Sequence, residues 1–246
     1  KVLGVPVSVE LASEFRYREP IVGKNDLGIV ISQSGETMDT IAATELLKEN
    51  GSHVLALVNV VGSSLARMAD SVFYLHVGPE IGVASTKAYL GMLVSQLVIA
   101  KHWDAENKLD VSFDEIAELP KLIDKTMACE GQIKEISEKI YKKNDIYFIG
   151  RGLDYALAAE GALKLKEISY LHAEALAAGE LKHGTLALIE KGTPVIVTAS
   201  QNHLLDKTTS NVQEVIARGA YVIAIGDSES EKLENISNDY VTLPDS

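Results

Sequence analysis

A cluster of polar side chains follows an apolar run early in the sequence. Residues 31–37 read ISQSGET, between an expected strand at 27–31 and an expected helix that begins near Met38. This heptapeptide has one glycine, no lysine or arginine, and four hydroxyl or amide side chains: Ser32, Gln33, Ser34 and Thr37. An ordinary turn with helix caps would use such residues. Outward-pointing amides at a helix start, joined by neutral hydroxyl donors, would equally suit a phosphate monoester bound without a cation.

Two other glycine-containing loops resemble ligand-binding turns less closely. EIGVAST at 80–86 opens another expected helix with Gly82, Ser85 and Thr86, and helix capping is the simpler interpretation of that loop. GRGLDYA at 150–156 begins like a dinucleotide-binding turn. The third glycine of that fingerprint would fall at Tyr155, so we discount a dinucleotide site.

Titratable residues concentrate in the segment 161–188, GALKLKEISYLHAEALAAGELKHGTLAL. Lys164 and Glu167 are three residues apart on an expected helix, where they can form a surface ion pair. A carboxylate partly buried beside a lysine could instead act as a general base. His183 stands in an expected turn, where it is either an exposed loop residue or a proton shuttle near neutral pH.

The elements that must position these residues alternate between short apolar strands and amphipathic helices. The expected strands are 27–31, 54–59, 71–76, 146–149, 194–199, 221–225 and 240–243, and the expected helices are 39–49, 86–101, 156–168 and 204–218. This alternation predicts an α/β fold in which helices cover both faces of parallel sheets. Such folds bind ligands at the carboxyl ends of strands, where ISQSGET would lie.

The two halves of the chain repeat the same order of signals. GIVIS at 28–32 aligns with PVIVT at 194–198 (194 − 28 = 166), ASEFRY at 12–17 aligns with AGELKH at 178–183 at the same offset, and HVLALV at 53–58 aligns with AYVIAI at 220–225. We therefore predict two tandem, doubly wound parallel-sheet subdomains of flavodoxin-like type, at 1–103 and 145–246.

The region between the subdomains, 104–144, contains two amphipathic stretches that we interpret as connecting helices, with Pro120 as a break or restart. The strand and glycine turn at 145–152 has no counterpart before residue 1, and the helix at 86–101 has none after residue 246. We expect a double domain clipped at both ends.

Composition narrows the classes of partner and cofactor. The formal net charge is −12, and the 23 lysine and arginine residues are scattered, so we expect no nucleic-acid partner and no attraction to a membrane surface. No apolar run reaches the roughly 18 residues of a membrane span. A single cysteine, Cys129, and the lack of a signal peptide favour the cytoplasm. The six histidines show no HExxH spacing, so we expect neither a metal nor another cofactor.

Four motifs together resemble the sugar-isomerase (SIS) double domain of the glucosamine-6-phosphate synthase family: SQSGET, EIGVASTKAY, EGALKLKEISYLHAEALAAGELKHG and TLALI. SQSGET recurs in many phosphosugar-binding domains, whereas the long third motif is specific to this family. The resemblance implies that one group of residues holds the sugar phosphate, Ser32, Gln33, Ser34 and Thr37. It also implies that Val83 and Ser85 line the sugar.

The same resemblance assigns the chemistry. Glu167 would move a proton between C1 and C2, with Lys164 beside it, and His183 would assist ring opening in the neighbouring subunit. The implied reaction converts fructose 6-phosphate and glutamine to glucosamine 6-phosphate and glutamate by ring opening, imine formation and a proton shift. The implied partners are fructose 6-phosphate, glucose 6-phosphate, glucosamine 6-phosphate, a second copy of the chain and an amino-terminal glutaminase domain of the same polypeptide.

Some family features fall outside this sequence. The first substrate loop would lie before Lys1 and the lysine that forms a Schiff base with the ketose would lie after Ser246, while Thr185 stands where proline is common. Two alternatives stay open: a stand-alone phosphosugar isomerase or deglycase, and a non-catalytic phosphosugar sensor. A sensor could lose Glu167 and His183, and their presence favours an enzyme.

Overall fold

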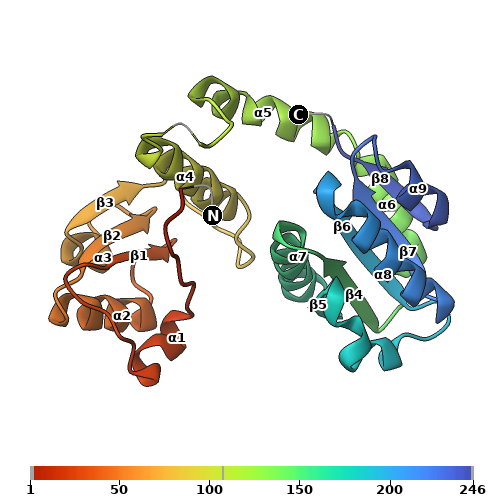
Figure 1. The fold of residues 1–246 in the computed structure, drawn as a ribbon, viewed down its shortest axis with the longest axis horizontal. Coiled ribbons are helices and arrows are strands. Elements are labelled where there is room, and N and C mark those ends of the chain that lie inside the picture. Colours follow the sequence, from red (N-terminus) through yellow and green to blue (C-terminus); the bar gives the residue numbers. More distant parts are fainter. Residues whose placement is uncertain (1–2, 107, 245–246) are drawn as a thin grey trace. The chain divides into compact units, whose positions relative to one another are not determined.

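The chain forms two compact units. The computed structural model describes residues 3–106 and 108–244, and contacts between residues divide the chain into units at 1–117 and 118–246. The boundary lies within helix α5 (Phe113–Met127). Each unit has its own parallel sheet and its own apolar core (Figure 1). Among the described residues, no helix has the length and apolar character needed to cross a membrane.

Unit 1 is built on three parallel strands in the order β1-β2-β3. The strands are β1 (Leu27–Ser32), β2 (His53–Val58) and β3 (Ser71–Tyr74). The helical segments are α1 (Ala12–Phe15), η1 (Arg16–Arg18), α2 (Met38–Glu49), α3 (Ser64–Met68) and α4 (Lys87–Trp103). Alternate residues of β1 are buried, and one of them, Val30, packs with β2, α2 and α3 in one apolar cluster. Because all three strands are parallel, the loops that follow them emerge at the same edge of the sheet.

Unit 2 contains five parallel strands in the order β5-β4-β6-β7-β8. The strands are β4 (Asp145–Gly150), β5 (His172–Ala177), β6 (Pro194–Ala199), β7 (Tyr221–Gly226) and β8 (Asp239–Thr242). The helical segments, after the part of α5 that belongs to this unit, are α6 (Glu130–Ile140), α7 (Leu153–Ser169), η2 (Ala178–His183), η3 (Thr185–Leu188), η4 (Asn202–Leu204), α8 (Leu205–Ala217) and α9 (Glu231–Ile236).

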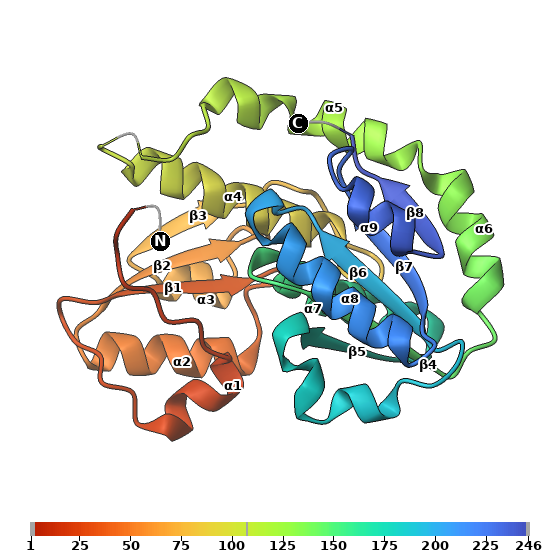
Figure 2. The ribbon, with the colours of Figure 1, turned by 45° about the vertical axis from the view of Figure 1, so that its right-hand side comes forward.

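Helices cover both faces of the five-stranded sheet. One face packs against α8, α9 and η2, which contribute Val212, Leu233 and Leu181 to a large buried cluster. The opposite face packs against α7, through Ala158 and Ala162, and against α6. Figure 2 shows α8 lying across one face of this sheet. The segments α7 and η2 therefore lie on opposite faces of the sheet, although β5 alone separates them in sequence.

The predicted α/β fold with parallel sheets is confirmed, and all seven predicted strands and four predicted helices are present. The strand β5 was not predicted. Its sequence, HAEALA, has no β-branched residue and is rich in helix formers. It is a strand because it pairs along its whole length with β4, from Asp145 opposite His172 to Gly150 opposite Ala177.

The predicted break at Pro120 is wrong, because α5 continues through this proline. Pro120 is exposed to solvent, where water can replace the backbone donor that proline lacks. The connecting region 104–144 does contain two helices, α5 and α6, and Ile136 of α6 packs on β7 and β8. The inner limits predicted for the subdomains, at 103 and 145, remain predictions, and residues 1 and 246 lie outside the described residues.

The two units repeat their elements in the predicted order, but the predicted sequence alignment of β1 with β6 is wrong by one residue. In unit 1, Val30 of β1 faces α2, and in unit 2 the residue of β6 that faces α8 is Val197, which is 167 positions later. The sequence alignment placed Val30 on Ile196, which contacts the other face. Side chains alternate between faces along a strand, so a shift of one residue exchanges the two faces.

Candidate active site

The loop after β1 forms a tight turn stabilised by its own hydroxyl groups. Ser32 is buried at the end of the strand, and its Oγ accepts a hydrogen bond from the amide of Gly35 at 3.1 Å. Ser32 Oγ and Thr37 Oγ1 share another hydrogen bond at 3.0 Å. Ser34 Oγ accepts one from the amide of Glu36 at 3.2 Å. The structure thus brings the predicted phosphate ligands together in one turn, with Gly35 in the left-handed region at φ +68°.

The start of α2 is open. Thr37 occupies the N-cap position but makes no side-chain hydrogen bond to the first turn of the helix. Simple capping would require such a bond. The first amides of α2 and the positive end of its dipole therefore have no side-chain acceptor from Thr37, and they could bind an anion.

Residues that follow β2 stabilise the loop after β1 through hydrogen bonds. The amide of Asn59 donates to the Gln33 carbonyl at 3.1 Å, and the amide of Leu65 donates to the Gly35 carbonyl at 3.0 Å. Glu36 accepts a hydrogen bond from the amide of Ser64 at 2.8 Å. Hydrogen bonds with Ser64 lower the pKa of Glu36, so the one carboxylate in the loop is bound by the start of α3.

The loop after β3 carries the predicted sugar-binding residues. Val83 is 98% exposed, and Ser85 donates to Glu80 at 3.2 Å. Glu80 also accepts from the amide of Ala88 at 2.9 Å, and this bond is the main reason that the pKa of Glu80 is lowered. Glu80 thus caps α4, which is the function that the sequence had favoured for this loop.

Asn59 joins the loops after β1 and β3. Its backbone bonds to Gln33, while its side chain donates to the Gly78 carbonyl at 2.7 Å and accepts from the amide of Val77 at 3.1 Å. Sequence reasoning missed Asn59, Glu36 and Glu80. The signal that could have identified Asn59 is a polar residue directly after a buried strand, at the edge where α/β folds bind ligands.

The predicted acid–base pair forms on α7. Lys164 Nζ lies 2.5 Å from Glu167 Oε2 and 3.6 Å from Glu160 Oε1, and the side chains of all three residues are partly buried. The hydrogen bond with Glu167 is the main reason that the pKa of Lys164 is raised. Glu167 therefore lies beside a positive charge on the same helix.

His183 does not join this pair in the same chain. It lies at the end of η2, is exposed, and makes no hydrogen bond or ion pair within the described ranges. The segment η2 packs on the α8 face of the sheet, whereas α7 with Glu167 packs on the opposite face. The sheet of unit 2 thus lies between the segments that carry these two residues.

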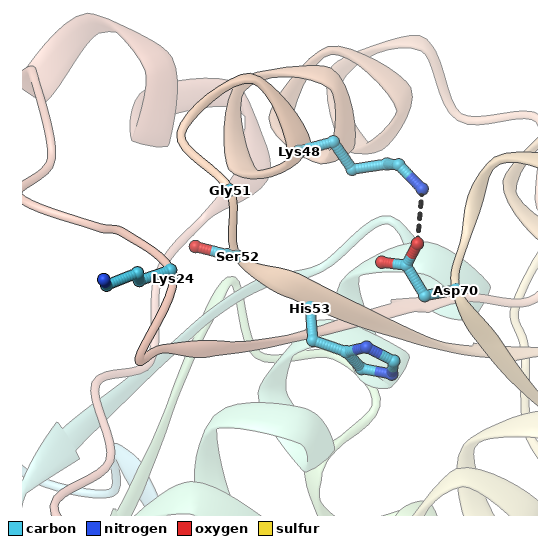
Figure 3. Close-up of a pocket in the computed structure, with 6 residues that line it drawn as sticks. All are labelled: Lys24, Lys48, Gly51, Ser52, His53 and Asp70. Carbon is cyan, nitrogen blue, oxygen red and sulfur yellow. Dashed lines mark hydrogen bonds and ion pairs between the residues drawn. The ribbon is translucent and has the colours of Figure 1, made fainter.

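A polar hollow of about 320 Å³ lies at the opposite edge of unit 1 (Figure 3). It is located at the amino ends of β1 and β2 and is lined by Lys24, Lys48, Gly51, Ser52, His53 and Asp70. Lys48 pairs with Asp70 at 2.7 Å, which neutralises one of its two lysines. The hollow shares no residue with the loop after β1, so it is not part of the candidate site. Within the described residues, no three potential metal ligands of the His, Cys, Asp or Glu type come together.

Comparison with known proteins identifies the family. The SIS domain model matches residues 1–101 and 139–243, which is most of the chain. The chain belongs to the SIS domain family. The resemblance inferred from the sequence motifs is thereby confirmed.

Two curated relatives of this SIS chain carry the same name. The glutamine–fructose-6-phosphate aminotransferase (isomerizing) of Clostridium tetani is 47% identical over 99% of the chain, and that of Caldanaerobacter subterraneus subsp. tengcongensis is 49% identical over 98%. The SIS chain spans 41% of the length of each. The C-terminal domain of glucosamine-fructose-6-phosphate aminotransferase from Francisella tularensis has a TM-score of 0.90 and 42% identity, covering 99% of this chain and 70% of that one.

Proposed function

We propose that this SIS chain is the isomerase part of an enzyme that converts fructose 6-phosphate and glutamine to glucosamine 6-phosphate and glutamate. The names of the relatives matched over nearly the whole chain support this reaction. The observation that carries the proposal is the uncapped start of α2 beside the hydroxyls of Ser32, Ser34 and Thr37. Such a turn can hold the phosphate of a sugar, and Val83 and Ser85 of the neighbouring loop would line the sugar ring.

The phosphate would serve as a remote anchor for chemistry at C1 and C2. Binding energy from a group that does not react can hold the reacting carbons near a base. Glu167 would accept a proton from one carbon and return it to the next, and its bond to Lys164 would orient it. His183 would donate and accept protons when the sugar ring opens.

We infer that the active enzyme is a homodimer in which His183 serves the site of the partner. The positions of α7 and η2 on opposite faces of one sheet support this, because the sheet lies between the two segments that carry Glu167 and His183. Two-fold symmetry is the commonest way to close such an assembly. Mixing His183→Ala with Glu167→Gln subunits should restore part of the activity, since mixed dimers contain one complete site. No recovery, with subunit exchange verified, would mean that each site is built from one chain.

The rest of the polypeptide would supply ammonia. The chain spans 41% of the length of its relatives, so we propose that an amino-terminal glutaminase domain of the same polypeptide hydrolyses glutamine in the cytoplasm. Glucose 6-phosphate and glucosamine 6-phosphate would bind the same phosphate turn.

The Glu167→Gln variant tests the enzymatic proposal. This change keeps the shape of the side chain and removes the base, so the isomerisation rate of the complete polypeptide should fall about 10²–10⁴-fold. Affinity for fructose 6-phosphate should stay within a few-fold because the phosphate turn lies in the other unit. Exchange of deuterium at C1 of labelled substrate follows the proton transfer independently of glutamine hydrolysis. Glu138→Gln, an exposed glutamate on α6, is the matched control. A parental rate in Glu167→Gln would mean that Glu167 is only half of an ion pair with Lys164 and that another group is the base.

A further inference from the structure

The segment η2, which ends at His183, is held by side chains that the proposed chemistry does not use. Ala178 and Leu181 are fully buried and attach η2 to the core. Arg151, directly after β4, places its guanidinium group against Gly179. A Cβ atom at position 179 would lie 3.1 Å from one guanidinium nitrogen and 3.4 Å from the other. Glycine at this position therefore allows the planar group to lie flat against the backbone of η2.

A series of polar contacts leads from Arg151 through α8 and back to η2. Arg151 Nε donates to Asn211 Oδ1 at 2.9 Å, and Asn211 is buried in α8. Asn211 Nδ2 lies 3.5 Å from Glu214 Oε1. The same oxygen of Glu214 forms an ion pair with Lys182 Nζ at 3.0 Å. This series of contacts therefore holds η2 at two points, at Gly179 and at Lys182, the residue before His183.

We propose that Arg151 is a positioning residue that fixes η2 and thereby the location of His183. The inference rests on the proposed role of His183 in ring opening. A segment of six residues in a 3₁₀ conformation has poor hydrogen-bond geometry of its own. Gly184 follows directly after His183 at φ +141°, a conformation that favours glycine. The side-chain contacts of Arg151 and Lys182 thus determine the position of His183. A displacement of about 1 Å at a reacting group can lower the reaction rate about 10²-fold.

Arginine is required at this position for its shape as well as its charge. The guanidinium group is planar and its Nε–H donates along a fixed direction, whereas a lysine ammonium is a compact point charge on a flexible stem. Arg151→Lys keeps the charge and loses both the flat contact with Gly179 and the bond to Asn211. Arg151→Lys therefore tests the shape and contacts of the guanidinium group separately from its charge.

A double-mutant cycle tests the proposal in the complete polypeptide. Arg151→Lys should lower kcat for glucosamine 6-phosphate formation about 10-fold, with the KM for fructose 6-phosphate within about 2-fold, because the residue acts through His183. In a His183→Ala background the same change should have almost no further effect. Lys182→Met removes the ion pair with Glu214 at an exposed side chain and should give a smaller kcat loss that also disappears in the His183→Ala background. Arg218→Lys, an exposed arginine after α8, should leave kcat unchanged in both backgrounds.

The outcomes separate this inference from the proposed function. If Arg151→Lys lowers kcat equally with and without His183, Arg151 supports the fold in general and the positioning role is wrong. If Arg151→Lys and Lys182→Met leave kcat at the parental value while His183→Ala lowers it, His183 is needed but is positioned by other contacts. If His183→Ala itself has the parental rate, the ring-opening role proposed for His183 is wrong and the inference about Arg151 falls with it.

Discussion

The loops after β1 and β6 occupy corresponding places in the two units, but their hydrogen bonds differ. After β6, the buried carboxylate of Asp154 accepts hydrogen bonds from the amide and hydroxyl of Ser200, at 3.1 and 2.6 Å, and from Gln201 Nε2 at 3.1 Å. After β1, the hydroxyls bond within their own turn and the start of α2 is left uncapped. One loop holds an anion of the chain itself, and the other is open to an anion from outside.

The difference arises from the neighbouring helix. Asp154 lies in the first turn of α7, which follows β4, and β4 is the neighbour of β6 in the sheet. Among the described strands, β1 pairs only with β2, and the helix that follows β2, α3, contacts the loop after β1 through the backbone amides of Ser64 and Leu65. The comparison teaches that loops at the same edge of the same type of sheet can bond to a carboxyl group of the chain in one unit and leave a helix start uncapped in the other.

Replacing Asp154 should have the largest effect on stability. Asp154→Ala removes a buried carboxyl group together with the hydrogen bonds that it accepts from Ser200 and Gln201, and we expect the free energy of unfolding to fall by about 3 kcal/mol. Urea unfolding measures this loss, and Asp124→Ala, at an exposed site on α5, is the control. A loss below about 1 kcal/mol would show that the loop after β6 does not depend on its internal carboxylate.

Replacing Gly35 should affect both stability and ligand binding in unit 1. Gly35→Ala introduces strain at φ +68° and a Cβ that overlaps the Ser63 side chain, so we expect a loss of about 1–3 kcal/mol together with weaker phosphate binding. Gly62 has a similar φ of +72° with no atom near a Cβ, so Gly62→Ala measures the backbone strain alone. Equal losses in both variants would contradict the close contact between Gly35 and Ser63.

The fold was largely predictable because its strands are apolar runs bounded by turn residues. The exception, β5, lacks that signal and depends on pairing with β4. The turn of ISQSGET and the contact of Lys164 with Glu167 were predictable because both depend on local spacing. The sequence could not predict that α7 and η2, which carry Glu167 and His183, lie on opposite faces of the five-stranded sheet. That arrangement depends on which face of the sheet η2 covers. Asp154 was missed because an acidic residue in the first turn of a helix usually interacts only with the helix dipole.

A smaller effect is expected in the dependence of stability on pH. The pKa of Glu36 lies below its ordinary value of 4.5 because Ser64 donates hydrogen bonds to its carboxylate. A lowered pKa in the folded state contributes stability above the unfolded value, and this contribution is lost as the pH falls through the folded value. Glu36→Gln should therefore reduce the loss of stability that the parent shows on acidification below about pH 4.5. Unfolding curves between pH 3 and pH 6 measure the free energy of unfolding of the parent and of Glu36→Gln. Identical pH profiles for the two proteins would contradict the bond to Ser64.

Titration calorimetry with fructose 6-phosphate and with fructose tests most directly whether the loop after β1 is the phosphate anchor. The complete polypeptide should bind the phosphate ester far more tightly than the free sugar. Ser34→Ala combined with Thr37→Ala should remove most of that preference, since each hydrogen bond to a charged group contributes about 1.5–3 kcal/mol. The corresponding change in unit 2, Ser200→Ala, should leave the preference intact while it lowers stability. Equal affinities for the two sugars in the parent, or an unchanged preference in the Ser34→Ala, Thr37→Ala variant, would contradict the assignment of this loop.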